Sequence, residues 1–385
     1  MLAGRESMKL LHLSDLHIGK RVNGFSMLED QRYLLNQLKD LAVTEEANGV
    51  LLAGDLYDKP VPSGEAVELL DEFLTDLCRA GLPVFAISGN HDSPERLSFG
   101  ARLMEEEGIH LTSIYRGAEE PAVLEDEYGP VRIYLLPYLR PATLRHVYPA
   151  AEVVTYEQAV AYAISQWSVD PAVRNVLVAH QFVTGGTTCE SEELSVGGLD
   201  QIAAEVFAPF DYVALGHLHG PQLIERSTLR YCGSPLKYSI SECRQEKAAC
   251  FVTLGEKGNI SVEQIPLRPL RDLREIRGSY DQVTAKTFWE RTNREDYLHI
   301  ILTEEEDVPE AIGRLRAIYP NLMKLTYDNL RTRETQKIEG LEHWQEKSPL
   351  ALFQQLYQRQ NNQSMSREQE AFLTALMERL WEGEP

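Results

Sequence analysis

The chain has 385 residues, 43% of them hydrophobic and 25% charged, a balance typical of a globular protein with a sizeable core. No apolar run approaches the roughly 18 residues of a membrane span, so we expect neither a transmembrane segment nor a signal peptide. The net charge of −21 argues against an indiscriminate nucleic-acid binder, because contacts to phosphate dominate such binding. A site whose local field is set by bound cations is still compatible with that charge.

Two features of composition bear on the compartment and on the start of the fold. The five cysteines are odd in number and include no C-x-x-C pair, which predicts reduced structural thiols in a cytoplasmic protein. We expect residues 1–7 to be an extension ahead of a second start at Met8.

Strand-like and helical segments alternate over residues 8–265, which favours parallel βαβ units in a two-sheet α/β sandwich. Apolar positions at helical spacing predict helices at 28–44, 63–79, 96–107 and 156–167. Short apolar runs predict strands at 10–13, 50–54, 83–89, 131–138, 175–179 and 212–216. Three closing antiparallel strands are predicted at 229–232, 248–254 and 260–265, with a turn at 257–259.

Prolines in the stretch 266–270 predict a domain boundary. Residues 266–330 follow with a β-α-β-α-β pattern, which predicts a small α+β domain. Residues 331–347 are polar without a period and predict a linker.

The last segment, 348–385, predicts two amphipathic helices, one begun by Ser348-Pro349 and one by the capping box Ser366-x-x-Gln369. A pair this short cannot bury its apolar stripes alone. It either docks back onto this chain or fills a partner's groove, and the polar linker before it favours the partner.

Five of the predicted strands end in side chains that bind metal ions. In open α/β sheets functional groups gather beyond the carboxyl ends of the strands, so we expect these side chains to meet at one edge of the sandwich. If strand geometry continues past Leu13, Asp15 and His17 also point to the same face. The candidate side chains, in chain order, are Asp15, His17, Asp55, Asp58, Asn90, His91, Asp92, His180, His217 and His219. Carboxylate and amide oxygens mixed with imidazoles, and no thiolates, favour Mn²⁺, with Fe or Zn as alternatives.

These motifs, in this order, resemble the signature of the calcineurin-like metallophosphoesterase family. They are Asp15-x-His17, Gly54-Asp55-x-x-Asp58, Gly89-Asn90-His91-Asp92, His180 and Gly216-His217-x-His219. Ser88 to Ser93, Gly185-Gly186 and Tyr231-x-Gly233-Ser234-Pro235 are most similar to the branch of nuclease subunits that act with an SbcC-type ATPase. The resemblance runs from Met8 over nearly the whole chain and is looser toward the C-terminal end.

The resemblance implies two divalent metal ions and a role for each motif residue. It assigns Asp15, His17 and His219 to the first ion, and Asn90, His180 and His217 to the second. It makes Asp55 the bridge between the two ions. It leaves His91 as the general acid and Asp58 as the residue that orients it. For Asp92 we predict only a helix cap.

The resemblance also implies an Mn-dependent DNA exonuclease or endonuclease that hydrolyses phosphodiesters by a two-metal mechanism in DNA repair and recombination. It further implies a homodimer, a capping domain at 266–330 over the nuclease cleft, and helices at 348–385 that bind the SbcC-type ATPase. Candidates for a basic rim around the cleft are Lys20, Arg21, Lys59 and Arg96.

Two other functions stay open at this stage. One is a different metallophosphoesterase, either a cyclic-nucleotide phosphodiesterase or a protein phosphatase. Lys59-Pro60 follows Asp58 where those phosphatases carry Arg-Gly, and a small-substrate enzyme has no need of the C-terminal extension. The other is a scaffold that has lost its metals, which the complete set of ligand positions argues against.

Overall fold

The computed structural model describes residues 7–118, 120–192, 200–330, 349–361 and 363–382. The chain divides into two compact units, Met1–Asp272 and Leu273–Pro385. The predicted linker at 331–347 and the predicted cap Ser348 lie outside the described residues. Within the described part of the chain, no helix has both the length and the apolar character that a bilayer crossing requires.

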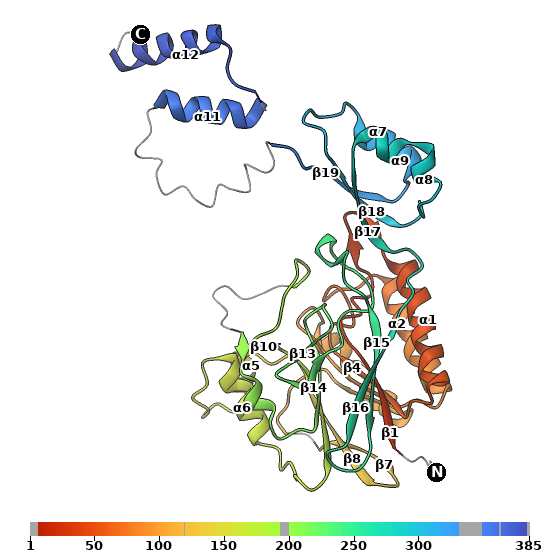
Figure 1. The fold of residues 1–385 in the computed structure, drawn as a ribbon. Coiled ribbons are helices and arrows are strands. Elements are labelled where there is room, and N and C mark those ends of the chain that lie inside the picture. The colour runs from red at the N-terminus through yellow and green to blue at the C-terminus, as the bar shows by residue number, and fades with distance from the viewer. Residues whose placement is uncertain (1–6, 119, 193–199, 331–348, 362, 383–385) are drawn as a thin grey trace. The chain divides into compact units, whose positions relative to one another are not determined.

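The first unit contains two six-stranded mixed sheets (Figure 1). In the first sheet, in the order β16-β15-β1-β4-β5-β6, the strands β1, β4, β5 and β6 pair in parallel, and β15 runs antiparallel to both of its neighbours, β1 and β16. Its strands are β1 (Met8–Leu13), β4 (Gly49–Ala53), β5 (Val84–Ile87), β6 (Ile109–Thr112), β15 (Ala248–Leu254) and β16 (Ile260–Pro266).

The second sheet has the order β13-β14-β12-β9-β8-β7, with β8, β9, β12 and β14 parallel. Its strands are β7 (Ala122–Asp126), β8 (Gly129–Leu136), β9 (Arg174–His180), β12 (Tyr212–Gly216), β13 (Gln222–Ile224) and β14 (Arg226–Tyr231). Two small two-stranded sheets pair β2 (Arg21–Val22) with β3 (Phe25–Ser26), and β10 (Phe182–Val183) with β11 (Gln201–Ile202).

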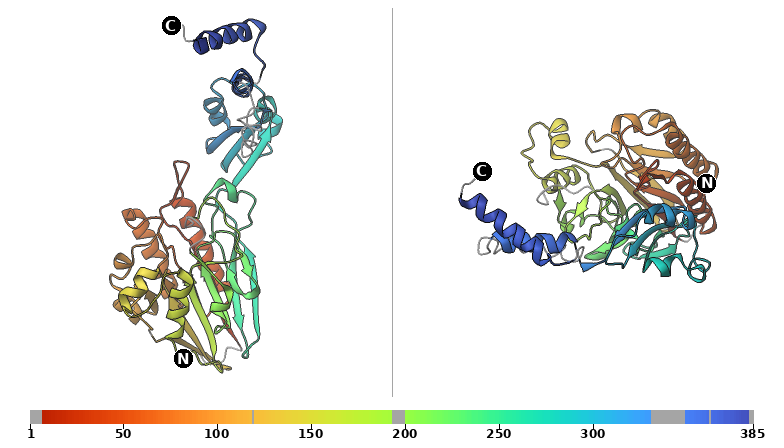
Figure 2. Two further views of the ribbon diagram at one scale, coloured as in Figure 1. Left: turned by 90° about the vertical axis from the view of Figure 1, so that its left-hand side faces the viewer. Right: turned by 90° about the horizontal axis from the view of Figure 1, so that it is seen from above.

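Helices cover the outer face of each sheet, and Figures 1 and 2 show the two helix pairs on opposite sides of the paired sheets. The first pair is α1 (Leu28–Thr44) and α2 (Gly64–Arg79), and the second is α5 (Pro141–Val147) and α6 (Tyr156–Ser165). Two short 3-10 turns also occur, η1 (Ala204–Phe207) and η2 (Ile240–Glu242).

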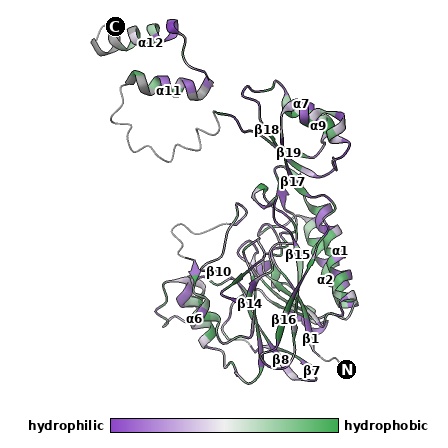
Figure 3. Ribbon diagram, viewed as in Figure 1, coloured by the Kyte–Doolittle hydropathy of each residue, from purple (hydrophilic) through white to green (hydrophobic). Residues whose placement is uncertain are grey.

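The strand sequences build this sandwich because both of their faces are apolar. One set of alternate residues forms the core between the sheets, including Leu10, Phe85 and Val178. The other set on the second sheet, including Leu177, packs with α6 residues such as Val160. Figure 3 shows the hydrophobic residues gathered in these strands and on one side of the surrounding helices. The predicted α/β sandwich is thus confirmed.

The structure differs from the sequence prediction at one helix and one strand of the first unit. The helix expected at 96–107 is two pieces, α3 (Pro94–Leu97) and α4 (Ala101–Glu106), because Gly100 takes a left-handed conformation with φ 75° and breaks the helix. The strand expected to close the sheet in antiparallel fashion at 229–232 is β14, which pairs parallel with β12 and antiparallel only with β13.

The second unit begins with a three-stranded parallel sheet, in the order β17 (Leu273–Gly278), β18 (Tyr297–Leu302), β19 (Leu322–Tyr327). The first helix of the predicted β-α-β-α-β pattern is split into α7 (Tyr280–Thr284) and α8 (Lys286–Trp289), and α9 (Ala311–Ile318) precedes β19. Ile276 of β17, Ile300 of β18 and Leu315 of α9 share one apolar core. The sheet is wholly parallel, an α/β arrangement where we expected α+β.

Two further helices complete this unit, α11 (Pro349–Asn361) and α12 (Arg367–Glu382). The predicted capping box is present, since the Ser366 and Gln369 side chains each bond the other's main-chain amide. The helices contact each other through Gln369 Nε2, which donates to the Tyr357 hydroxyl at 2.9 Å.

Candidate metal centre

The carboxyl ends of β1, β4, β5, β9 and β12 deliver the predicted ligands to one edge of the sandwich. Asp15 and His17 do not arrive by strand alternation as predicted, because β1 ends at Leu13. Their backbones are left-handed, with φ 53° and 43°, and Asp55 and His217 also have positive φ, 49° and 105°. Such conformations are unfavourable for residues with a Cβ and cluster at functional sites. The loops therefore hold these side chains at a cost in backbone strain.

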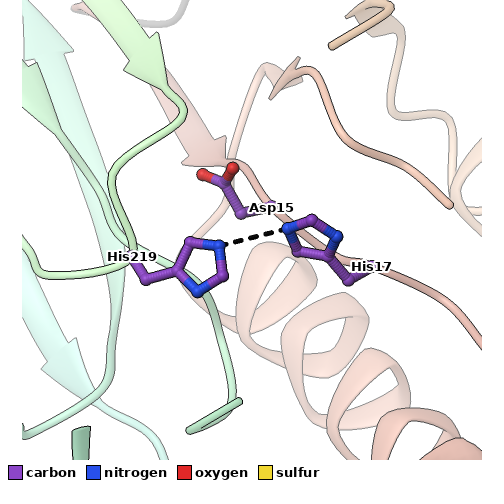
Figure 4. A group of neighbouring side chains, drawn as sticks. All are labelled: Asp15, His17 and His219. Atoms are coloured by element: carbon purple, nitrogen blue, oxygen red, sulfur yellow. Dashed lines mark hydrogen bonds between the residues drawn. The ribbon is translucent and has the colours of Figure 1, made fainter. Parts of the chain in front are cut away.

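Asp15, His17 and His219 converge from two distant parts of the chain (Figure 4). The Nε2 atoms of His17 and His219 face each other at 3.1 Å. All three residues are almost completely buried, with at most 2% of their surface exposed. The Asp15 carboxylate is itself held, because it accepts from the Ser14 hydroxyl at 2.5 Å and from the His217 amide at 3.1 Å.

A second group of ligand atoms lies beside the first. The Asn90 side-chain oxygen is 2.9 Å from His180 Nε2 and 3.1 Å from His217 Nδ1. His180 Nδ1 is fixed by the Ala53 carbonyl oxygen at 2.8 Å, so its Nε2 faces the group. The structure thus brings together the three residues predicted for a second ion.

Asp55 touches both groups. Its Oδ2 atom is 3.3 Å from His180 Nε2 and 3.7 Å from His17 Nε2, while Oδ1 accepts from the His91 amide at 2.8 Å. The Asp55 side chain is about 3% exposed. Among the described residues, no other carboxylate forms an ion pair with an imidazole from each group, as expected of a ligand shared by two ions.

Burial and close charges perturb these groups strongly. Burial raises the pKa of Asp15, lowers that of His17, and lowers that of His217 to about 3. Burial also opposes charge on Asp55 and His180, but their mutual attraction outweighs it. The pKa of Asp55 therefore falls, and that of His180 rises to about 9. A cation that binds here must displace the His180 proton.

Two glycines let the loops approach this closely. Gly54 has φ 84°, and a Cβ built on it would lie 2.5 Å from His180 Nδ1. A Cβ on Gly216 would collide with the Ala53 carbonyl oxygen, which is the group that fixes the His180 ring. Glycine is therefore required at both strand ends.

His91 lies at the rim of the site, half-buried. Its ring packs edge-on against His17, with centroids 4.8 Å apart, and its Nδ1 is 3.2 Å from the main-chain oxygen of Asp58. The predicted contact with Asp58 is therefore made by the backbone. The Asp58 carboxylate instead pairs with Lys20 at 2.7 Å. His17, Asp58 and His91 also lie close enough together to hold an ion.

Asp92 is not the helix cap we predicted, because Ser93 caps α3. The Asp92 carboxylate is 5% exposed and accepts three main-chain amides, from Gly89, Leu56 and Tyr57, at 2.9 to 3.1 Å. It therefore fastens the loop after β4 to the loop after β5. These two loops carry Asp55 and Asn90.

Replacement of Asp92 by alanine is expected to lower the free energy of unfolding by about 3 kcal/mol or more. Three main-chain amides, two of them fully buried, lose their acceptor, and each buried group without an acceptor costs about 1–3 kcal/mol. Urea denaturation with a chelator present measures the loss without metal effects. Asp71→Ala, on the exposed side of α2, is the matched control. A loss below about 1 kcal/mol would contradict this role.

Sequence reasoning missed several groups that support the site. Glu242 is completely buried behind His219, with Oε1 3.4 Å from His219 Nδ1. Tyr138 packs beside His217, with ring centroids 6.4 Å apart, and the exposed Arg140 lies over the Tyr138 ring at 5.5 Å. All three lie outside the strand-end motifs, so no spacing signal marked them.

The buried donor set fits divalent cations. His17 Nδ1 has no hydrogen-bond partner within the described residues, although it is fully buried. Two imidazole nitrogens that face each other at 3.1 Å share at most one proton between them, whereas a cation satisfies both lone pairs. Carboxylate, amide and imidazole ligands without thiolate suit Mn²⁺, Fe or Zn.

Comparisons with known proteins show the family of this chain. Residues 8–221, more than half of the chain, match the family model of the calcineurin-like phosphoesterases. The SbcD subunit of the SbcCD nuclease from Staphylococcus epidermidis is 34% identical over 323 residues, which cover 83% of this chain and 85% of that protein. The chain belongs to the calcineurin-like phosphoesterases, in the SbcD branch. As a phosphoesterase of this family it is a metal-dependent hydrolase, so the prediction of an enzyme is confirmed.

The chain also matches a second family model and, more weakly, two solved structures. Residues 269–361 match a second family model, SbcD_C, described as the type 5 capsule protein repressor C-terminal domain. Among solved structures, TT1561 of Thermus thermophilus has a TM-score of 0.38 at 14% identity and covers 67% of this chain and 99% of its own. A dimetal phosphatase from Danio rerio has a TM-score of 0.41 at 13% identity, with 68% and 96% covered. Structural similarity at this level defines no function.

Proposed function

We propose that this phosphoesterase is a DNA nuclease subunit that hydrolyses phosphodiester bonds at a site for two Mn²⁺ ions. The observation that carries the proposal is the position of Asp55, whose carboxylate contacts one imidazole from each ligand group. The first group is Asp15, His17 and His219, and the second is Asn90, His180 and His217. When bound, divalent cations supply positive charge against the phosphate and make water acidic enough to act as the nucleophile.

The residues around the ligands have separate tasks in this proposal. His91 is left as the proton donor to the departing oxygen, because it lies at the open rim and its backbone amide, not its ring, contacts Asp55. The backbone oxygen of Asp58 orients the His91 ring through Nδ1, which leaves Nε2 for the substrate. Lys20 pairs with the Asp58 carboxylate and so reduces the repulsion between that carboxylate and an anionic substrate.

A nucleic-acid strand is the substrate class that the surroundings favour. Arg140 lies exposed over Tyr138 and has no carboxylate partner among the ion pairs of the described residues. A guanidinium held on an aromatic ring beside the metal ligands suits a neighbouring phosphate of a polymer. Of the four predicted rim cations, Lys59 and Arg96 are exposed, Arg21 bonds the Gly24 carbonyl oxygen of its own turn, and Lys20 is paired.

The C-terminal helices are proposed as the attachment to an SbcC-type ATPase, with 331–347 as the linker. Leu373 of α12 is buried, at 7% exposure. Phe353, Leu356 and Phe372 remain 41%, 49% and 66% exposed. Aromatic and leucine side chains at helical spacing suit a partner's groove. The S. epidermidis relative is named as a subunit of a complex, which supports such a partner. A homodimer is also proposed, from the family resemblance.

Phe353→Asp is expected to abolish co-purification with the ATPase while leaving Mn²⁺ content and hydrolysis of small phosphodiesters unchanged. A carboxylate placed in an apolar groove without a partner costs several kcal/mol of binding. The measurement is a pull-down with the purified ATPase, followed by titration.

Gln358→Asp adds the same charge at an exposed position of the same helix and serves as the control. Capture of the ATPase at full affinity by the Phe353 variant would move the interface elsewhere. Loss of the thermal transition would instead assign these helices to the protein's own core.

The nuclease proposal is tested by substrate comparison. With Mn²⁺, the purified chain should hydrolyse linear duplex DNA and bis-p-nitrophenyl phosphate, and chelator should stop both reactions. It should hydrolyse p-nitrophenyl phosphate and cyclic nucleotides far more slowly. A preference for the monoester would support a phosphatase, and a preference for cyclic nucleotides a different phosphodiesterase.

A further inference from the structure

A buried ion pair lies directly behind the first ligand group. The Glu242 carboxylate, completely buried at the end of η2, receives the Lys247 ammonium group at 2.6 Å. Lys247 lies just before β15 and is only 8% exposed. It also donates to the side chains of Ser234 at 2.9 Å and Gln245 at 2.8 Å, so its charge is fully satisfied.

Stability alone does not explain this pair. Removing two charges from water costs several kcal/mol each, and apolar residues of similar volume often stabilise such a position equally well or better. A buried ion pair therefore calls for a second role. Here both members of the pair touch the same residue, His219.

Three separate contacts fix His219. Its ring Nδ1 is 3.4 Å from Glu242 Oε1, and its carbonyl oxygen accepts from Lys247 at 2.8 Å. Its amide donates to the Glu192 carboxylate at 2.7 Å. With Nδ1 facing a carboxylate, the proton belongs on Nδ1 and the Nε2 lone pair points away from it. That Nε2 is the atom which faces His17 at 3.1 Å in the first ligand group.

We propose that Glu242 and Lys247 are positioning residues that fix the tautomer and the orientation of His219 for cation binding. This inference rests on the proposed function, because it assumes that Asp15, His17 and His219 take up an ion. Lys247 holds the His219 backbone and the Glu242 carboxylate together, and Glu242 accepts the ring proton. Outer carboxylates of this kind typically contribute about 10–100-fold to metal affinity.

The test compares two double variants of the full chain by calorimetric titration with Mn²⁺. Glu242→Leu with Lys247→Met removes the acceptor and both charges, and we expect the affinity to fall about 10–100-fold. Glu242→Gln with Lys247→Met removes the charges but keeps an oxygen for the Nδ1 proton, and we expect most of the affinity to be retained. In chelator, the leucine variant should melt below the wild-type temperature, because the buried Tyr238 amide also loses its acceptor in Glu242. The glutamine variant keeps an oxygen for that amide and should melt closer to the wild type.

A buried ion pair elsewhere in the same unit provides the control. Asp126 and Arg174 pair at 2.5 Å with side chains 2% and 4% exposed, and neither contacts a candidate ligand. Asp126→Leu with Arg174→Met should leave Mn²⁺ affinity unchanged. Nitrogen-15 NMR of the metal-free protein should show the Nδ1–H tautomer of His219 in the wild type and in the glutamine variant, and a mixture in the leucine variant.

The outcomes separate the two levels of the proposal. Wild-type affinity in the leucine variant would overturn the positioning role. If the leucine variant does not fold, the glutamine variant decides. A 10-fold or greater loss of Mn²⁺ affinity in the glutamine variant, with the Nδ1–H tautomer of His219 retained, would also overturn the positioning role. A wild-type chain that binds no Mn²⁺ would contradict the proposed function as well, whereas these variant results leave that function intact.

Discussion

Asp55→Asn is expected to remove the metal ions and lower turnover by about 10³-fold or more. The asparagine keeps the oxygen that accepts the His91 amide, so the loop should stay in place. It loses the negative charge that contacts an imidazole of each ligand group. Divalent cations contribute several kcal/mol to phosphoester hydrolysis, and each 1.36 kcal/mol is tenfold in rate. Elemental analysis of the purified protein and hydrolysis of bis-p-nitrophenyl phosphate measure both effects.

The control for Asp55→Asn is the same substitution at an exposed aspartate. Asp71→Asn, on the exposed side of α2, makes the same chemical change away from the site and should retain both metals and turnover. If Asp55→Asn keeps its metal content and its turnover, the shared carboxylate is not a ligand and the assignment of the whole site is wrong.

His91→Ala is expected to retain the metal ions while turnover falls about 10²–10⁴-fold, the usual contribution of a general acid. The contact between His91 and Asp55 is made by the backbone amide, which alanine retains. The substitution should therefore leave the ligand positions intact. The p-nitrophenolate that leaves bis-p-nitrophenyl phosphate needs no proton. The rate of hydrolysis of this substrate by His91→Ala should therefore fall much less than the rate with DNA.

The contrary result would give His91 a different role. His91, His17 and Asp58 lie close enough to hold an ion, so loss of metal in His91→Ala would make His91 a ligand. His146→Ala, at an exposed position of α5, controls for the loss of an imidazole.

Helices and strands were predicted correctly where the local preference of the sequence agrees with the packing of the segment in the fold. The helix at 28–44 has the predicted bounds, and the helix predicted at 63–79 is α2 with Ser63 as its cap, because amphipathic periodicity and capping chemistry are local. The prediction of one continuous helix at 96–107 was wrong, because the left-handed conformation of Gly100 interrupts the helix despite the apolar periodicity. β14 was placed antiparallel because strand direction depends on partners that are distant in the chain.

In the metal centre, too, local sequence features were predictable and features that depend on distant contacts were not. The candidate ligands were predictable as strand-end motifs, yet the geometry that brings Asp15 and His17 together was not, since it depends on positive φ angles at residues other than glycine. Asp92 was misassigned because its three amide partners come from two loops. Glu242 and Lys247 carry no motif, and only the fold brings them behind His219.

In the proposed metal centre, two ions share Asp55. Crystals grown with Mn²⁺ and measured at the manganese absorption edge test it directly through an anomalous difference map. We expect two peaks per chain, one among Asp15, His17 and His219 and the other among Asn90, His180 and His217, each within bonding distance of Asp55. A single peak, or two peaks of which only one touches Asp55, would contradict it.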